Sequence, residues 1–266
     1  MESTLIEVAT SGIWQTTSTI VSSRGACVVI DPAYFPRELA AIAGRVAELG
    51  RAEAVVFTHG HWDHVMGHAA LPDAQVWLSE RLERSIADGD PRAADYLDAA
   101  RAFDSRWYVP RPYGHRWPDN RRGLRDDERV EFGGVTMRVL QLDGHSPDGL
   151  GLIVDGVLVV GDYLSPCEIP FVDDARAYRA TLARLIAVLP ELREVIPGHG
   201  PRLSVGDALV IARADLDYLD ALLEAAARGD PSSSSCVSLP RAEDVVGMRQ
   251  YHADNLAKLV ARAGRA

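Results

Sequence analysis

Hydrophobic runs bounded by turn residues divide the first part of the chain into short strands and one amphipathic helix. Apolar or alternating segments predict strands at 5–8, 17–21, 26–30 and 54–57. Between the last two strands, Pro36 begins a pattern with apolar residues three or four positions apart, and this helical pattern ends at Gly50. The chain therefore begins with a strand-rich segment that closes in a βαβ unit.

The rest of the chain continues this alternation. Further strands are predicted at 73–78, 135–142, 150–154 and 157–160, and another that ends at Ile196. Helices are predicted at 79–108, with a break at Gly89-Asp90-Pro91, and at 175–189, 206–228 and 241–262. The stretch 110–128 has no clear period and predicts a long loop, and 231–235 predicts a serine-rich linker. This order predicts an α/β fold in which two mixed sheets form a sandwich with helices outside.

Composition narrows the class of protein and its partners. The chain has 266 residues, 47% of them hydrophobic and 25% charged, which is enough for one or two globular domains. Its net charge of −10 disfavours nucleic acid as a partner. No run approaches the roughly 20 apolar residues of a membrane span, and no secretory signal is visible, so we expect a cytoplasmic protein without a membrane partner. Three scattered cysteines without a CxxC spacing leave histidines and carboxylates as the candidate metal ligands.

A cluster of ligand-type residues follows the predicted strand at 54–57. His59, His61, Asp63 and His64 occupy four of six consecutive positions there, at the end of a strand where open α/β sheets bind their ligands. In an extended turn, His59 and His61 can face one side while Asp63 and His64 face another, so this segment could supply ligands to two metal ions. A polar loop with chance histidines is the alternative, and the density of ligand-type residues argues against it.

Three later residues stand at similar positions. His145 follows the strand predicted at 135–142, Asp162 follows the strand predicted at 157–160, and His199 lies in a sharp turn between glycines. A carboxylate has two oxygens and can bridge two cations, which an imidazole cannot do. Asp162 is therefore the natural bridge between two ions. Asp31, which ends a strand before a proline, could support a ligand imidazole or begin a turn.

Taken in order, these motifs resemble those of the metallo-β-lactamase-fold hydrolases, in particular the glyoxalase-II-like and lactonase-like branch. The motifs are His59-x-His61-x-Asp63-His64, Gly144-His145-Ser146, Gly161-Asp162 and Pro197-Gly198-His199-Gly200. The resemblance covers about residues 5–205 and implies a four-layer αββα sandwich with a dinuclear metal site between the sheets. By analogy, one ion is held by His59, His61 and His145, the other by Asp63, His64 and His199, and Asp162 bridges them. We expect a catalytic domain at 1–205 and C-terminal helices at 206–266 that pack on it.

The predicted activity is that of a metal-dependent hydrolase acting on a small molecule. Two divalent cations that share a water molecule lower its pKa toward about 7, and the resulting hydroxide would attack the carbonyl of a thioester, an ester or a lactone. Asp63 could orient this nucleophile as well as bind metal. Tyr163 follows the predicted bridge and could donate to the oxyanion, with packing as its alternative role. Zinc suits this histidine-rich set without thiolates, and iron or manganese is compatible with it.

Other members of the fold suggest alternative functions. A β-lactam hydrolase would use the same nucleophile on an amide, but the lack of a visible export signal disfavours it. An iron-dependent oxygen or persulfide redox enzyme is a second alternative, and the complete set of seven ligands argues against a mononuclear form. A nuclease is disfavoured by the net charge. The eight arginines in 101–129 could bind an anionic substrate tail, or belong to a solvated loop. No dense basic cluster follows residue 205, which argues against glutathione thioesters.

Overall fold

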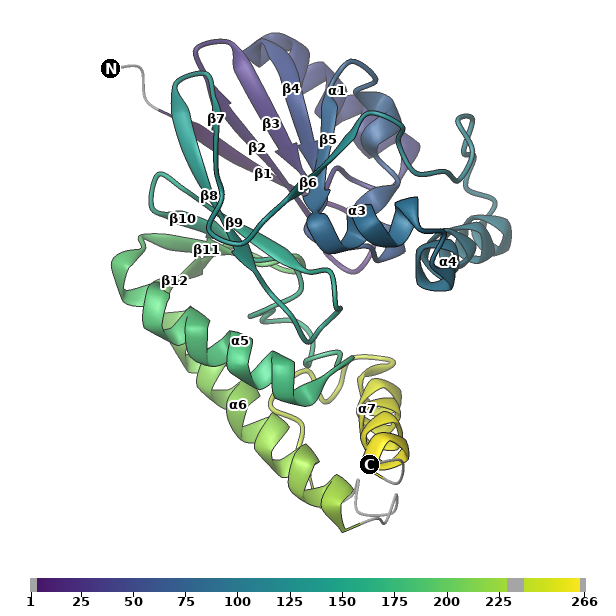
Figure 1. Cartoon of the computed structure of the whole chain (residues 1–266), viewed down its shortest axis with the longest axis vertical. Helices are drawn as coiled ribbons and strands as arrows, with labels where there is room; N and C mark the ends of the chain where they lie inside the picture. Colours follow the sequence, from purple (N-terminus) through teal and green to yellow (C-terminus); the bar gives the residue numbers. More distant parts are fainter. Residues whose placement is uncertain (1–3, 229–236, 264–266) are drawn as a thin grey trace.

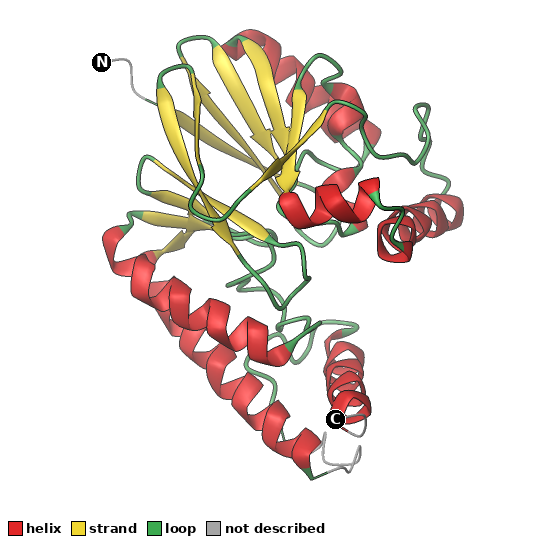
Figure 2. Cartoon of the chain, viewed as in Figure 1, coloured by secondary structure: helices red, strands yellow, loops and turns green. Residues whose placement is uncertain are grey.

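The computed structural model describes residues 4–228 and 237–263, which form two six-stranded sheets packed face to face with helices outside (Figures 1 and 2). The first half of the chain contains β1 (Leu5–Thr10), β2 (Thr17–Ser23), β3 (Ala26–Ile30), α1 (Pro36–Leu49), β4 (Arg51–Val56), α2 (Trp62–Val65), η1 (His68–Ala70), β5 (Gln75–Ser79), α3 (Glu80–Ala87), α4 (Pro91–Trp107) and β6 (Arg121–Leu124). The second half contains β7 (Arg129–Phe132), β8 (Val135–Gln141), β9 (Leu150–Val154), β10 (Val157–Val159), α5 (Ala175–Val188), η2 (Leu189–Glu191), β11 (Glu194–Ile196), β12 (Leu203–Ser204), α6 (Val205–Ala227) and α7 (Met248–Ala263). The predicted αββα sandwich is confirmed.

The first sheet has the order β1-β2-β3-β4-β5-β6 and is covered on both faces. Alternation along β3 sends Cys27 and Val29 toward the helical layer, where Ile42 of α1 packs, and Val28 and Ile30 toward the second sheet. Each fully buried side chain of this size contributes about 1.5–3 kcal/mol through removal of apolar surface from water. The parallel pairing of β3 with β4 brings the carboxyl ends of these strands to the same edge of the sheet.

The second sheet has the order β12-β11-β10-β9-β8-β7. β9 and β10 form the predicted hairpin, whose turn residues Asp155 and Gly156 both have a positive φ, at 48° and 73°. β10 and β11 are parallel, so the segments that follow them leave the sheet at the same edge. Since β8 is antiparallel to β9 and β9 to β10, the end of β8 also lies there. This edge faces the carboxyl ends of β3 and β4.

The helices α5 and α6 lie along the outer face of the second sheet, and α7 packs against α6 farther from the strands (Figure 1). Leu182 of α5, Leu219 of α6 and Leu256 of α7 belong to one buried cluster with Leu140 and Leu158 of the sheet. The C-terminal helices therefore bury their apolar faces against the same core as the strands. The domain boundary at residue 205 stays a prediction.

The sequence predicted most of the longer elements, while the short elements α2, η1, η2 and β12 and the elements described next were not predicted as they stand. β6 and β7 were missed, because β6 is a short edge strand within the predicted loop at 110–128 and β7 carries charged residues at alternate positions. The last helix begins at Met248 and not at residue 241, and 241–247 is irregular. The predicted linker at 231–235 lies outside the described residues.

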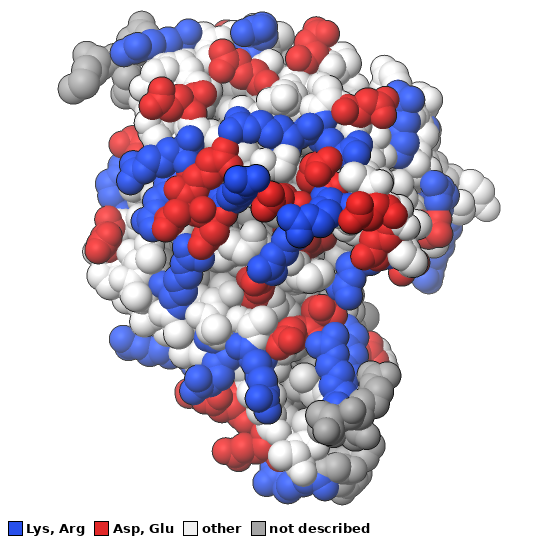
Figure 3. Space-filling view, in the orientation of Figure 1, with Lys and Arg blue, Asp and Glu red and all other residues white. Residues whose placement is uncertain are grey.

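Within 4–228 and 237–263, no helix combines the length and the apolar character that crossing a bilayer requires. Figure 3 shows basic and acidic side chains intermingled over one face of the molecule. Ion pairs at the surface include those of Arg125 with Glu80 and of Arg138 with Asp127. Exposed pairs of this kind contribute only about 0–1 kcal/mol each, so stability comes mainly from the apolar layers.

Candidate metal centre

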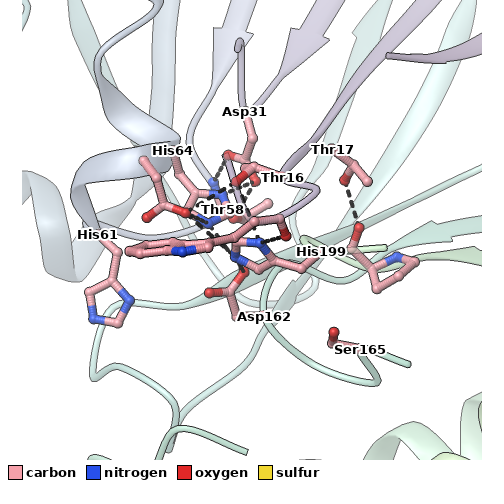
Figure 4. Close-up of polar contacts among 12 residues, drawn as sticks. Thr16, Thr17, Asp31, Thr58, His61, His64, Asp162, Ser165 and His199 are labelled. Carbon is pink, nitrogen blue, oxygen red and sulfur yellow. Dashed lines mark hydrogen bonds and ion pairs between the residues drawn. The ribbon is translucent and has the colours of Figure 1, made fainter. Parts of the chain in front are cut away.

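The seven side chains predicted as metal ligands lie together at the edge where the strand ends of the two sheets meet. They are His59 and His61 between β4 and α2, Asp63 and His64 in α2, His145 after β8, Asp162 after β10 and His199 after β11. Figure 4 shows His64 and His199 close together, with Asp162 on one side of them and Asp31 on the other. Residues separated by up to 140 positions along the chain (199 − 59) thus share one site.

One group of donor atoms comes from His59, His61, His145 and Asp162. Nδ1 of His61 lies 2.9 Å from Nε2 of His145. Oδ2 of Asp162 lies 3.3 Å from Nε2 of His145 and 3.5 Å from Nε2 of His59. Three imidazoles and one carboxylate oxygen, all within 4.8 Å of one another, form a set that could hold one cation.

A second group comes from Asp63, His64 and His199. Oδ1 of Asp162 lies 3.2 Å from Nε2 of His64 and 3.3 Å from Nε2 of His199. Oδ2 of Asp63 lies 3.4 Å from the first of these nitrogens and 3.5 Å from the second. Asp162 therefore turns one oxygen toward each group, which is the arrangement of a bridging carboxylate.

The spacing and the burial of these atoms fit a pair of divalent cations. Two ligand atoms about 2.1 Å from a tetrahedral cation lie about 3.4 Å apart, and Asp162 lies 3.2 to 3.5 Å from four imidazoles. Nε2 of His59, Nε2 of His64 and Oδ1 of Asp162 are buried and have no hydrogen-bond partner among the described residues. A buried polar atom without a partner costs about 1–3 kcal/mol, and a cation in each group would satisfy these atoms.

A carboxylate behind the site orients two of the imidazoles (Figure 4). Nδ1 of His64 donates to Oδ2 of Asp31 over 3.0 Å, and the hydroxyl of Thr58 donates to the same oxygen over 2.6 Å. Nδ1 of His59 donates in turn to the hydroxyl of Thr58 over 3.1 Å. Both rings therefore direct Nε2 into the site, so Asp31 supports imidazoles and does not merely begin a turn.

Backbone carbonyls orient two other imidazoles. Nδ1 of His145 donates to the carbonyl of Phe171, and Nδ1 of His199 donates to the carbonyl of Trp14, each over 3.0 Å. The turn around His199 also needs a glycine, because a Cβ at Gly198 would lie 2.2 Å from Oδ1 of Asp162. The motif glycine is therefore required for the close approach of the backbone to the bridging carboxylate.

Burial and charge act differently on the imidazoles. Burial lowers the pKa of His59 well below its usual value and that of His61 to about 3, so these rings are neutral. Burial also acts to lower the pKa of His64 and of His199, but the neighbouring carboxylates outweigh it. They raise the pKa of His64 well above its usual value and that of His199 to about 10. The second group is therefore an environment that favours positive charge.

The hydroxyl of Tyr163 lies inside the protein and not at the site surface. It accepts a hydrogen bond from the backbone N–H of His145 over 3.0 Å and donates to the carbonyl of Asp143 over 2.6 Å. Tyr163 does not line the cavity above the candidate centre. Its geometry is that of a residue that holds the His145 loop, and the predicted role as an oxyanion donor has no support from its position.

A cavity of about 510 Å³ opens above the two groups and is bordered by His61, Asp63, His145, Asp162 and His199. Glu168 also borders it, with an oxygen within 4.8 Å of donor atoms of Asp162 and His199. Burial raises the pKa of Glu168 to about 7, against the effect of the His199 imidazole. The sequence analysis missed this residue, because no motif surrounds it and its position depends on the conformation of the loop after Asp162.

The arginine-rich segment 101–129 does not border this cavity. Several of its arginines pair with nearby acidic side chains, as Arg111 does with buried Asp104 through two nitrogens at 2.9 and 3.1 Å. The guanidinium of Arg111 also stacks on the ring of Tyr34, 4.3 Å from its centroid. The suggested role of this segment in binding an anionic substrate tail therefore has no support from the structure.

The fold and the site define a class of αββα proteins with a candidate dinuclear metal centre between two sheets. The family model of the metallo-beta-lactamase superfamily matches residues 11–199, and the chain belongs to this superfamily. It is 29% identical over 182 residues to Hydroxyacylglutathione hydrolase 2 of Vibrio vulnificus strain YJ016. The match covers 68% of this chain and 59% of that relative, so the chain spans about three fifths of the relative's length. The family and the candidate site support an enzyme of the metal-dependent hydrolase type.

Two solved structures support the same assignment of the fold. A metallo-beta-lactamase family protein of Thermus thermophilus superposes with a TM-score of 0.69 at 21% identity, over 100% of this chain and 94% of the other. A di-iron-bound form of the protein TTHA1623 superposes with a TM-score of 0.56 at 28% identity, over 75% of this chain and 95% of the other.

Proposed function

We propose that the protein is a dinuclear metal-dependent hydrolase that cleaves the bond between the acyl carbon and the sulfur of a thioester, or the oxygen of an ester, including a lactone. The observation that carries the proposal is the position of Asp162, whose two oxygens face two separate sets of donors. Two divalent cations held there would activate a water molecule and polarise a substrate carbonyl. Zinc suits the ligand types, and the di-iron form of a similar structure makes iron the alternative.

In this proposal all seven side chains would hold metal, and Asp63 has a second role. His59, His61 and His145 bind one cation, Asp63, His64 and His199 bind the other, and Asp162 binds both. Asp63 borders the cavity, and the hydroxyl of Thr16 donates to its Oδ2 over 3.3 Å. This carboxylate is thereby held where it can accept a hydrogen bond from the attacking water and orient it.

Metal analysis and a substrate panel test the proposal. We expect about two zinc ions per chain and hydrolysis of a thioester, an ester or a lactone by the purified protein. Cleavage of a β-lactam alone would favour the β-lactam hydrolase instead. One iron per chain with oxygen consumption on a persulfide would favour the redox enzyme, and cleavage of a phosphodiester would favour a nuclease.

The variant Asp162→Asn tests the bridge directly. An amide carries no charge and offers one oxygen, so we expect metal content to fall to about one ion or fewer and turnover to fall by more than about 100-fold. Asp155→Asn is the matched control, because Asp155 lies exposed in the β9–β10 turn, where Asn also tolerates the positive φ. Two bound metals and full turnover in Asp162→Asn would contradict the assignment.

A further inference from the structure

The cavity above the candidate metal centre has an apolar wall that the hydrolytic step itself does not use. The wall comes mainly from the end of the chain, where Val245, Val246 and Met248 line the cavity. Phe171 and Tyr251 continue it, and their rings pack edge to face with centroids 5.6 Å apart. The predicted metal ligands His61 and His145 pack against the Phe171 ring and border the same cavity, so a bound molecule can reach both.

Large apolar side chains are exposed at the mouth of this cavity. Val246 is 98% exposed, Trp14 52% and Val245 46%. They are three of the eight large hydrophobic side chains that are exposed in the described part of the chain, and all three border this one cavity. Single exposed hydrophobic residues are normally scattered over a protein surface. A cluster of them beside a polar site indicates that a ligand covers this apolar surface when it binds.

Apart from the histidines of the two donor groups, the charged side chains that line the cavity have one sign. No lysine or arginine is among the lining residues that the structure describes, and the charged groups are the carboxylates of Asp63, Asp162 and Glu168. The ammonium of Lys258 lies 3.9 Å from the centroid of the Phe171 ring and does not line the cavity. A substrate tail that ends in a carboxylate would therefore find no lysine or arginine on the wall, and burying its charge there without such a partner would cost free energy.

We propose that the substrate carries an uncharged apolar group, such as an alkyl chain, that lies against the wall formed by Phe171, Val245, Val246, Met248 and Tyr251. The inference rests on the proposed function for the reacting carbonyl and adds the chemical class of the rest of the substrate. It separates this chain from a relative named for glutathione, since glutathione carries two carboxylates. The occupant of the wall is the substrate itself, because wall and metal ligands border one cavity.

Two substrate series of increasing chain length test this specificity. Butanoyl and octanoyl thioesters of N-acetylcysteamine extend the acyl side, and ethyl and hexyl acetates extend the leaving side. We expect kcat/KM to rise about threefold for each added methylene in one of the series. The monothioester of octanedioic acid has the same chain length as the octanoyl substrate but ends in a carboxylate, and we expect it to lose this gain. A flat response in both series, or a preference for the acid-ended substrate, would overturn the inference.

The variant Val246→Asp changes the wall without touching a predicted metal ligand. We expect kcat/KM for the longer substrate to fall about tenfold and that for the shorter one to change less than about twofold, with unchanged metal content. Val210→Asp is the matched control, because Val210 is also highly exposed, at 66%, but lies on α6 and does not line the cavity. An equal loss for both substrates, or no loss, would contradict the proposal.

Binding without hydrolysis separates this inference from the proposed function. 2-Octanone and 2-butanone are uncharged, cannot be hydrolysed, and should quench the fluorescence of Trp14 and Trp62 at the cavity. We expect 2-octanone to bind at least about tenfold more tightly. Such binding without hydrolysis of any ester would support the apolar wall and refute the hydrolase.

Sedimentation tests whether the wall is instead an interface between two copies of the chain. If the protein is a dimer, and Val246→Asp converts it to a monomer without changing the chain-length preference, the inference is overturned.

Discussion

Tyr163 shows how a hydroxyl next to a candidate metal ligand can hold the site without reacting. It joins the N–H of His145 to the carbonyl of Asp143, and its ring packs on Tyr178 with centroids 4.4 Å apart. Burial raises the pKa of its hydroxyl, which therefore stays protonated and able to donate. The loop that carries His145 is thereby tied to the residue directly after Asp162.

The variant Tyr163→Phe distinguishes a holding role from a catalytic one. It leaves the amide of His145 and the carbonyl of Asp143 without this partner, so we expect the free energy of unfolding to fall by about 1–3 kcal/mol. We expect kcat to fall less than about tenfold, because an oxyanion donor would cost about 100- to 1,000-fold. Urea unfolding and steady-state kinetics measure the two effects. Tyr113→Phe, at an exposed tyrosine, is the control, and a 100-fold loss of kcat in Tyr163→Phe would restore the oxyanion role.

Local sequence was sufficient for residues whose role follows from a motif and insufficient for those placed by loops. The seven candidate ligands could be predicted because dense histidines and aspartates follow apolar strands, and strand ends meet at one edge. The sequence left open whether Asp31 supports an imidazole or begins a turn. Its hydrogen-bond partners His64 and Thr58 follow a different strand, so local sequence could not decide between the two roles. Glu168 carries no signal, because only the folded loop brings it beside His199.

At the scale of elements, one arginine fixes the irregular segment before α7. Arg241 donates to both oxygens of Asp215 on α6, over 2.6 and 3.1 Å, and through Nε to the carbonyl of Ser165 over 2.6 Å. Asp215 is fully buried. This side chain joins α6, the loop after Asp162 and the apolar wall. The late start of α7 follows from the backbone of this segment, since Ala242 and Gly247 have positive φ values of 57° and 95° that a right-handed helix does not allow.

The variant Arg241→Ala should loosen the wall and spare the metal centre. It leaves the buried carboxylate of Asp215 without its cation, so we expect the free energy of unfolding to fall by about 3 kcal/mol. The KM for a long-chain substrate should rise, while metal content stays unchanged. Arg249→Ala in the same region is the control, because the pair of Arg249 with Glu243 is exposed and its loss should cost less than about 1 kcal/mol. Similar losses in both variants would show that Arg241 has no special role.

A helix bounded by proline and glycine could be predicted to the residue, whereas the short strands at the edges of the sheets could not be predicted. α1 runs from Pro36 to Leu49 as predicted, because a proline begins it and Gly50 follows it. In β7, Val130 and Phe132 are buried and alternate with charged residues, a pattern present in the sequence. Its four residues are too few for a periodic signal to stand out. β6 pairs with β5 as its one neighbouring strand and packs against α3, and local sequence does not reveal these contacts.

At the scale of the whole molecule, the division at residue 205 can be tested by unfolding. The helices beyond this boundary share one buried cluster with β8 and β10, so we expect the chain to unfold in one cooperative transition. All five tryptophans precede residue 118, so their fluorescence reports the first half of the chain. Circular dichroism at 222 nm also reports α5, α6 and α7. We expect the urea midpoints of the two signals to coincide. A loss of helical signal at lower urea, with fluorescence unchanged, would make 206–266 a separate unit, and the apolar wall would then be lost before the metal site.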